Sequence, residues 1–98
     1  MSQKQFIPEL ISKQLTDEQV DVRGVMAFSQ AMNEKLTECR KRGKGNWHKL
    51  NTVDPMTQKP NTVERFKEGI QIALNEGRMV DVANYAMMIY HREQMEKN

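Results

Sequence analysis

Apolar residues recur at intervals of three and four in three stretches of the chain, at 16–42, 62–76 and 78–95. The first stretch carries a stripe formed by Val22, Val25, Met26, Ser29, Met32, Leu36 and Cys39. The second carries Val63, Phe66, Ile70, Ala73 and Leu74, and the third carries Met79, Val82, Ala83, Ala86, Ile89 and Tyr90. Because this spacing places side chains on one side of an α-helix, the pattern predicts three main helices.

Residues at the ends of these stretches predict where each helix begins and ends. Thr16 and Gln19 have the spacing of a capping box, and Thr62 can cap the second helix. Asn75-Glu76-Gly77 predicts a helix stop and a tight turn. Residues 1–15 form an N-terminal arm, in which Pro8 is expected to begin a short helix that runs to Gln14. Residues 43–61 are predicted to be a basic turn and loop, with a turn at Asp54-Pro55.

The segment from Gly77 to Arg92, which contains most of the third stretch, is the most apolar part of the chain. It also has apolar residues, such as Val80 and Met87, outside its main stripe. A helix that is apolar on several sides has to be covered on several sides. We therefore predict an all-α fold, with 1–98 as a single domain. The three main helices and the short N-terminal helix would form an antiparallel bundle completed by oligomerisation.

Composition narrows the class of protein. The chain has 98 residues, of which 38% are hydrophobic and 29% charged, which is typical of one small globular domain. Its single cysteine, Cys39, excludes an intramolecular disulfide and fits a reducing compartment. No signal peptide or membrane-spanning run is visible, so we expect a cytoplasmic protein without a membrane partner. The net charge of +2 is too small to indicate nucleic-acid binding.

Residues 40–49, the sequence R-K-R-G-K-G-N-W-H-K, combine five Lys and Arg side chains with two glycines, a Trp and a His. Such a turn offers cations for phosphate groups, and Trp47 offers a ring on which a base can stack. The alternative is a basic turn that favours a helix C-terminus, with Trp47 as a core anchor. A nucleic-acid partner is not expected, because one basic turn with one Trp lacks a recognisable binding module.

Asp81 lies among apolar residues of the third stretch, where an unpaired carboxylate is costly to bury. Asn84 follows three residues later and shares its helix face. Two interpretations stay open. Asp81 either pairs with an Arg or Lys of a neighbouring helix, or it is a functional carboxylate.

Two segments resemble a known family. D-V-A-N-Y-A-M-M-I, residues 81–89, is similar to the last helix of the MazG-like all-α NTP pyrophosphohydrolases, particularly the short phage-type members. Residues 28–47, F-S-Q-A-M-N-E-K-L-T-E-C-R-K-R-G-K-G-N-W, resemble their first helix and the Lys-Gly-Trp turn after it. The resemblance extends from Phe28 to Arg92. It implies a phage-encoded protein that forms a homodimer or a dimer of dimers, with Lys44 and Trp47 near the active cleft.

The acidic motif of that family is only partly present. Its members hold magnesium with an E-E-x-x-E group on one helix and an E-x-x-D group on the next. Aligned on this chain, the first Glu is Glu68 and the final Asp is Asp81, whereas Gly69, Ile72 and Arg78 occupy positions where the family has carboxylates. The remaining carboxylates are a poor set for holding a metal and positioning water together.

Arg78 instead has the position of an anion ligand, since it lies near the start of a helix. A pair with Glu76 or Asp81 is the alternative. Our first hypothesis is a non-catalytic nucleotide-binding protein that requires no cofactor and that sequesters or senses a nucleotide or a nucleotide-derived signal. The phosphates would contact Lys44 and Arg78. A base would stack on Trp47 or Tyr85, and Asn84 would donate or accept a hydrogen bond.

Two other hypotheses stay open. A Mg²⁺-dependent nucleoside triphosphate pyrophosphohydrolase with a reduced acidic site would use Glu64, Glu68 and Asp81 as metal ligands. A small phage inhibitor would instead bind a host protein, through the loop at 51–61 or the basic residues at 40–49.

Overall fold

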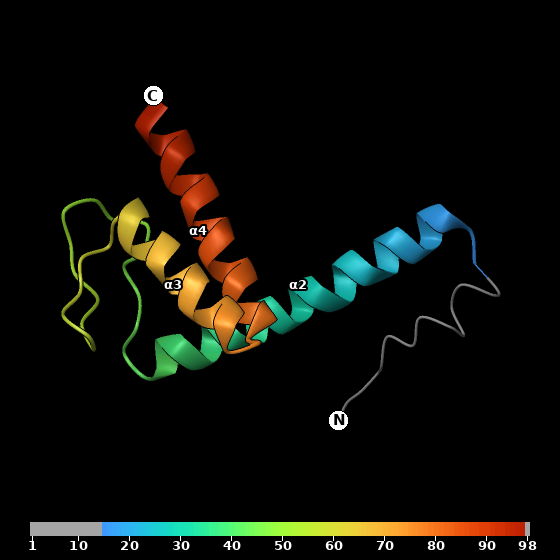
Figure 1. Ribbon diagram of the computed structural model, residues 1–98, viewed down its shortest axis with the longest axis horizontal. Helices are drawn as coiled ribbons and strands as arrows, with labels where there is room; N and C mark the ends of the chain where they lie inside the picture. Colours follow the sequence, from blue (N-terminus) through green and yellow to red (C-terminus); the bar gives the residue numbers. More distant parts are fainter. Residues whose placement is uncertain (1–14, 98) are drawn as a thin grey trace. The chain divides into compact units, whose positions relative to one another are not determined.

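The computed structural model describes residues 15–97 and divides the chain into two compact units, Met1–Ala31 and Met32–Asn98. Its described residues contain the helices α2 (Asp17–Lys41), α3 (Val63–Asn75) and α4 (Met79–Lys97), drawn in Figure 1. The predicted all-α class and the three main helices are confirmed, with most ends within one or two residues of the prediction. The short helix predicted from Pro8 to Gln14 lies outside the described residues.

The predicted helix starts are present as hydrogen bonds. At the start of α2, Thr16 Oγ1 accepts from the backbone N–H of Gln19 at 3.1 Å, and the Gln19 side chain accepts from the Thr16 N–H at 2.9 Å. This reciprocal pair is the predicted capping box. At the start of α3, Thr62 Oγ1 accepts from the Arg65 N–H at 3.1 Å. Both caps satisfy backbone donors that a helix leaves without an internal partner.

In the described part of the first unit, α2 is largely solvated. Val25 and Met26 are 68% and 64% exposed. The predicted apolar stripe is therefore present in the sequence but is not covered by the described residues of this unit.

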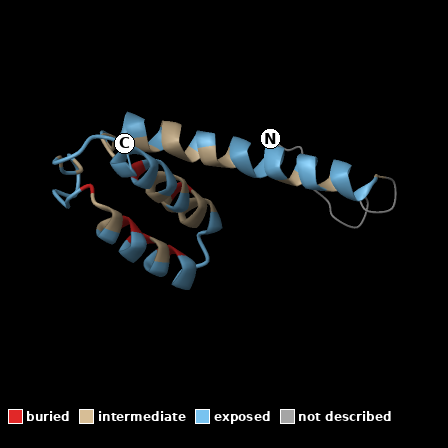
Figure 2. Cartoon of the chain, turned by 90° about the horizontal axis from the view of Figure 1, so that it is seen from above, coloured by how far each residue is buried: buried red, intermediate tan, exposed pale blue. Residues whose placement is uncertain are grey.

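The second unit contains the last part of α2 together with α3 and α4. A tight turn joins α3 to α4: Gly77 has φ +74°, and the Arg78 N–H donates to the Ala73 carbonyl at 2.8 Å. Phe66 and Ala73 are the buried apolar residues of α3, and Figure 2 shows buried positions where α3 and α4 face each other. The predicted stop at Gly77 is confirmed.

One close contact sets the spacing between α3 and α4. The Tyr85 ring of α4 lies against the backbone of α3 at Gly69, where an added Cβ would come within 2.6 Å of Cζ. The same ring lies 6.2 Å from the Phe66 ring, centroid to centroid. Only glycine leaves room for this approach, so Gly69 determines how deeply Tyr85 packs.

The described residues of one chain do not fully cover the apolar surface of α4. Met79 is 45% and Tyr90 59% exposed, and the buried residues of α4 are Asn84 and Arg92. The prediction that several sides of this helix are covered is not met by the described residues alone. Oligomerisation and the complete bundle remain predictions.

The loop between α2 and α3 is ordered by its own hydrogen bonds. Val53 and Pro60 form an isolated antiparallel bridge. Within it, Asp54 Oδ1 accepts from the Met56 N–H at 2.8 Å, so the turn predicted at Asp54-Pro55 is confirmed. The Asn61 side chain donates to the Asn46 carbonyl at 3.2 Å and thereby ties the end of the loop to its beginning.

Arg92 ties the last part of α4 to the loop between α2 and α3. α4 continues to Lys97, and Arg92 is only 4% exposed. Its guanidinium donates to the carbonyls of Asn61 at 2.6 Å and Trp47 at 3.1 Å. The long apolar stem of arginine allows burial when the charged head finds acceptors, and here the loop backbone supplies them.

Candidate functional site

The second unit contains a pocket of about 440 Å³ between the C-terminal end of α2, the loop after it, α3 and α4. This volume is in the range of small-molecule binding sites. Its lining includes all five residues that the sequence predicted as nucleotide-binding: Lys44, Trp47, Arg78, Asn84 and Tyr85. Residues separated by up to 41 positions in the sequence therefore meet at one cavity.

Aromatic and apolar side chains form part of the wall. Phe66, Tyr85 and Met88 come from the two packed helices, and Trp47 comes from the loop. The Trp47 ring contacts two histidines, with centroid distances of 5.6 Å to His48 and 6.2 Å to His91. Its backbone carbonyl is held by Arg92. The wall therefore offers flat, partly exposed rings of the kind on which a heterocycle stacks.

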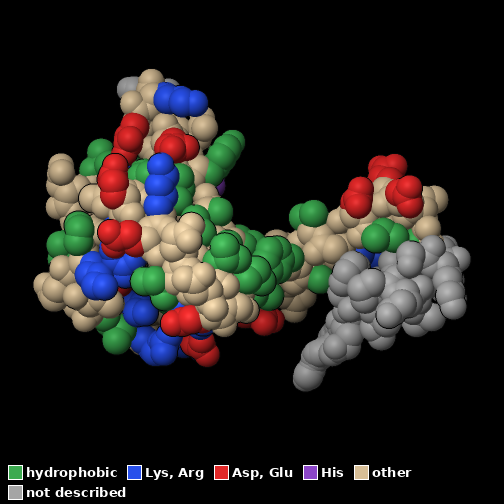
Figure 3. All heavy atoms as spheres, viewed as in Figure 1, with side chains coloured by type: hydrophobic (Ala, Val, Ile, Leu, Met, Phe, Trp, Pro, Cys, Tyr) green, Lys and Arg blue, Asp and Glu red, His purple; other side chains and the backbone are tan. Residues whose placement is uncertain are grey.

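The pocket is rich in positive charge. Its lining contains six Lys or Arg side chains and two carboxylates: Lys35, Arg40, Arg42, Lys44, Arg65 and Arg78 against Asp54 and Asp81. Figure 3 shows Lys and Arg side chains gathered where α2 ends and the loop begins. A concave site lined mostly by one sign of charge concentrates ions of the opposite sign. The pocket is therefore suited to an anion.

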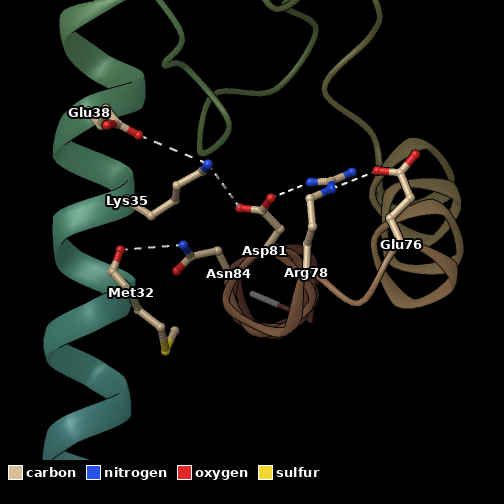
Figure 4. A network of polar contacts seen from close by, with 7 residues as sticks. All are labelled: Met32, Lys35, Glu38, Glu76, Arg78, Asp81 and Asn84. Atoms are coloured by element: carbon tan, nitrogen blue, oxygen red, sulfur yellow. Dashed lines mark hydrogen bonds and ion pairs between the residues drawn. The ribbon is translucent and has the colours of Figure 1, made fainter. Parts of the chain in front are cut away.

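Asp81 and Arg78 belong to a network of ion pairs, shown in Figure 4. Arg78 pairs with Asp81 and, at 2.7 Å, with Glu76. Lys35 of α2 approaches Asp81 at 3.9 Å and Glu38 at 4.0 Å. Asp81 therefore pairs with a cation of a neighbouring helix, as the first of its two interpretations predicts, and Arg78 makes both of the alternative contacts.

This network also affects the pKa of Arg78. Hydrogen bonds first to Glu76 and then to Asp81 raise the pKa of Arg78 above its ordinary value. A raised pKa in the folded state stabilises the fold. This contribution to the free energy of unfolding is fully present at any pH below the ordinary arginine pKa, and it is lost only as the pH rises through the raised pKa. Arginine is a cation throughout the neutral range with or without this shift.

Asn84 is 4% exposed and takes part in both helix packing and the pocket wall. Its Nδ2 donates to the Met32 carbonyl of α2 at 3.3 Å, as Figure 4 shows. Its Oδ1 is buried and has no hydrogen-bond partner among the described residues. Asn84 thus joins α4 to the last part of α2 and keeps one acceptor unsatisfied.

Two arginines of the second unit were not singled out by the sequence. Arg65 lines the pocket, and its Nε is buried without a hydrogen-bond partner in the described part of the chain. Arg92 holds the loop that carries Trp47. The sequence offered one signal for Arg65, a cation at the position where a capping box has Glu or Gln. It offered none for Arg92, whose acceptors are backbone carbonyls.

The carboxylates proposed as metal ligands do not meet. Glu64 and Glu68 are exposed on α3, whereas Asp81 lines the pocket. Within residues 15–97, no three side chains of the His, Cys, Asp and Glu types are grouped as metal ligands. The acidic site of the hydrolase hypothesis is therefore not assembled by the described residues of one chain.

The fold and pocket define a small all-α protein with a basic, aromatic-lined cavity. Comparisons with protein-family profiles, with curated proteins and with solved structures found no match to this chain. None of the helices that the structure describes combines the length and the hydropathy needed to cross a bilayer.

Proposed function

We propose that this chain is a non-catalytic nucleotide-binding protein that sequesters or senses a nucleotide or a nucleotide-derived signal. The observation that carries the proposal is the convergence of Lys44, Trp47, Arg78, Asn84 and Tyr85 on one pocket of about 440 Å³. The resemblance to MazG-like proteins, and with it a phage origin and a homo-oligomeric state, belongs to the same proposal.

The chemistry of the pocket supports a ligand with an anionic part and a flat aromatic part. Lysine and arginine bind phosphate oxygens, and arginine does so with two donors at once. Tyr85 and Trp47 offer ring surfaces for a base, on which stacking is favourable for every base. An inorganic anion would leave these rings unused, and an uncharged heterocycle would leave the cations unpaired. A nucleotide uses both.

Binding without hydrolysis is favoured by the position of the carboxylates. Metal-assisted attack of water on a triphosphate needs several oxygen ligands around a cation. The carboxylates that line the pocket are Asp54 and Asp81, and Asp81 is already paired with Arg78 and Lys35. Glu64 and Glu68 remain outside the pocket lining.

The proposal is tested by binding and product analysis on the same samples. Linear and cyclic nucleotides are screened by thermal shift, with and without Mg²⁺. Because Cys39 is the chain's only cysteine and lines the pocket, its alkylation rate reports occupancy directly. We expect at least one nucleotide to raise the melting temperature and slow alkylation of Cys39, and to be recovered intact by chromatography.

Matched variants locate the binding. Lys44→Gln removes a lining cation, and Lys67→Gln removes an exposed one from α3 that is outside the pocket lining. We expect Lys44→Gln to weaken binding and Lys67→Gln to leave it unchanged. Failure of every nucleotide to shift melting or protect Cys39 would reject the proposal. Release of pyrophosphate from a triphosphate, abolished by Asp81→Asn, would replace it with the hydrolase hypothesis.

A further inference from the structure

We infer that Arg65 is a ligand-binding residue and that, together with Arg42 and Lys44, it forms the subsite for a phosphate chain of at least two phosphoryl groups. This inference rests on the proposed function and specifies it: the ligand would be a nucleoside diphosphate or triphosphate, or another nucleotide with a diphosphate. Arg78, the cation that the sequence favoured, would have a mainly structural role.

Five of the six cations of the pocket fall into two groups according to their partners; the sixth, Arg40, donates to the Thr37 hydroxyl at 2.9 Å. Lys35 and Arg78 form ion pairs with Asp81, and each has a second carboxylate partner, Glu38 or Glu76. Their charge is therefore already compensated. A ligand that recruited Arg78 would have to compete with two carboxylates that the chain itself supplies.

The second group is uncompensated. The side chains of Arg42, Lys44 and Arg65 line the pocket, and among residues 15–97 none of them forms an ion pair or a hydrogen bond. The remaining lining carboxylate, Asp54, uses Oδ1 to accept from the Met56 N–H, and no Lys or Arg of the described chain lies within ion-pair distance of it. Within residues 15–97, these three positive charges at one pocket therefore have neither a carboxylate partner nor a side-chain hydrogen bond.

Arg65 carries the most specific signal of the three. Its Nε is shielded from solvent and has no acceptor within the described residues. A buried donor without a partner is unfavourable, and a charged one more so. Such a group is retained most simply where a ligand supplies the acceptor. A phosphate oxygen satisfies Nε and also neutralises the guanidinium, which stacking of a base cannot do.

Three uncompensated cations exceed what one phosphoryl group requires. A single phosphate has an average charge of about −1.5 to −2 at pH 7, whereas a diphosphate spreads a larger charge over two centres. The charge balance thus favours diphosphates and triphosphates over monophosphates and cyclic mononucleotides. It also predicts that the inorganic part alone binds, because the subsite does not depend on the base.

The experiment compares inorganic pyrophosphate with orthophosphate, and a nucleoside diphosphate with its monophosphate, by calorimetry and Cys39 protection. We expect pyrophosphate to bind more tightly than orthophosphate, and the diphosphate at least tenfold more tightly than the monophosphate. Arg65→Gln should weaken diphosphate binding by about tenfold or more, as expected for loss of a charge-assisted hydrogen bond. Arg65→Lys should restore part of it, and Lys67→Gln is the control.

The results distinguish this inference from the proposed function. One outcome is that nucleotides bind, Arg65→Gln leaves the affinity unchanged and Arg78→Gln lowers the affinity about tenfold. The phosphate subsite is then wrongly placed, and the proposed function stands. If nucleotides bind with no preference for a diphosphate, the inferred ligand class is wrong. If nothing binds, the proposed function fails first. Thermal unfolding of unliganded Arg65→Gln, expected at the wild-type temperature, excludes misfolding as the cause of a loss.

Discussion

Replacing Arg92 with methionine should destabilise the protein substantially, although Arg92 lies in the charged last part of α4. The substitution keeps an apolar stem of similar length and removes the guanidinium. It deletes the hydrogen bonds to the Asn61 carbonyl, at 2.6 Å, and to the Trp47 carbonyl, at 3.1 Å. It also removes the cation that lies 6.0 Å from the centre of the Phe66 ring.

The size of the stability loss follows from the burial of the backbone carbonyls that Arg92 no longer binds. Asn61 is 5% exposed, so its carbonyl has little access to water once its partner is lost. An unsatisfied buried acceptor costs about 1–3 kcal/mol, and a hydrogen bond from a charged donor contributes about 1.5–3 kcal/mol. Removing the buried, unpaired Nε of Arg92 offsets part of this loss. We expect a net decrease of about 2–3 kcal/mol in the free energy of unfolding, within the range set by these two contributions.

Urea unfolding followed by tryptophan fluorescence measures this change, because Trp47 is the only tryptophan and its own carbonyl is one of the acceptors. Glu96→Gln is the matched control, since Glu96 is 52% exposed and pairs with Arg92 at 3.9 Å. A pair of this kind contributes about 0–1 kcal/mol. The reasoning is refuted if Arg92→Met unfolds within about 0.5 kcal/mol of the wild type.

Three further changes test the packing and the helix ends. Gly69→Ala should push the Tyr85 ring out of its contact with α3. The overpacking cost of about 1–3 kcal/mol should exceed the helix-propensity gain of up to about 1 kcal/mol, so the free energy of unfolding should fall. Gly45→Ala is the control and should be neutral in the same urea experiment, because an added Cβ there meets nothing within 4 Å. Gly77→Ala should lower stability by about 1–2 kcal/mol, because φ is +74° there, and a wild-type melting temperature would contradict this. Thr62→Ala should cost about 1 kcal/mol through loss of the α3 cap, with Thr62→Ser as the variant expected to retain it.

The helices and their ends could be read from the sequence because their determinants are local. Thr16, Thr62 and Gly77 each act on groups within a few residues, so their spacing alone predicts the capping bonds and the turn. The proposal that five distant residues bind one ligand came through the resemblance and stays a prediction, although all five line one pocket. Periodicity by itself does not determine which helix faces meet.

The roles of Arg92 and Arg65 were not predictable for a physical reason. The acceptors of Arg92 are main-chain carbonyls, which every residue offers and no sequence pattern marks. Arg65 stands out because its buried Nε has no hydrogen-bond partner among the described residues, and a sequence does not show whether a donor has a partner. The sequence left two roles for Arg78 open, and the structure shows its pairing with Glu76 and Asp81.

The most direct test of the central claim is a titration of ¹⁵N-labelled protein with the nucleotide that gives the largest thermal shift, followed by two-dimensional NMR. We expect saturable shifts concentrated at Lys44, the Trp47 indole N–H and the Asn84 side-chain amide, with one ligand bound per pocket. Nucleotide binding at this pocket would be contradicted if the resonances of these three residues stay in place at a saturating nucleotide concentration. It would also be contradicted if the shifts are confined to the exposed face of α3 around Glu64 and Glu68.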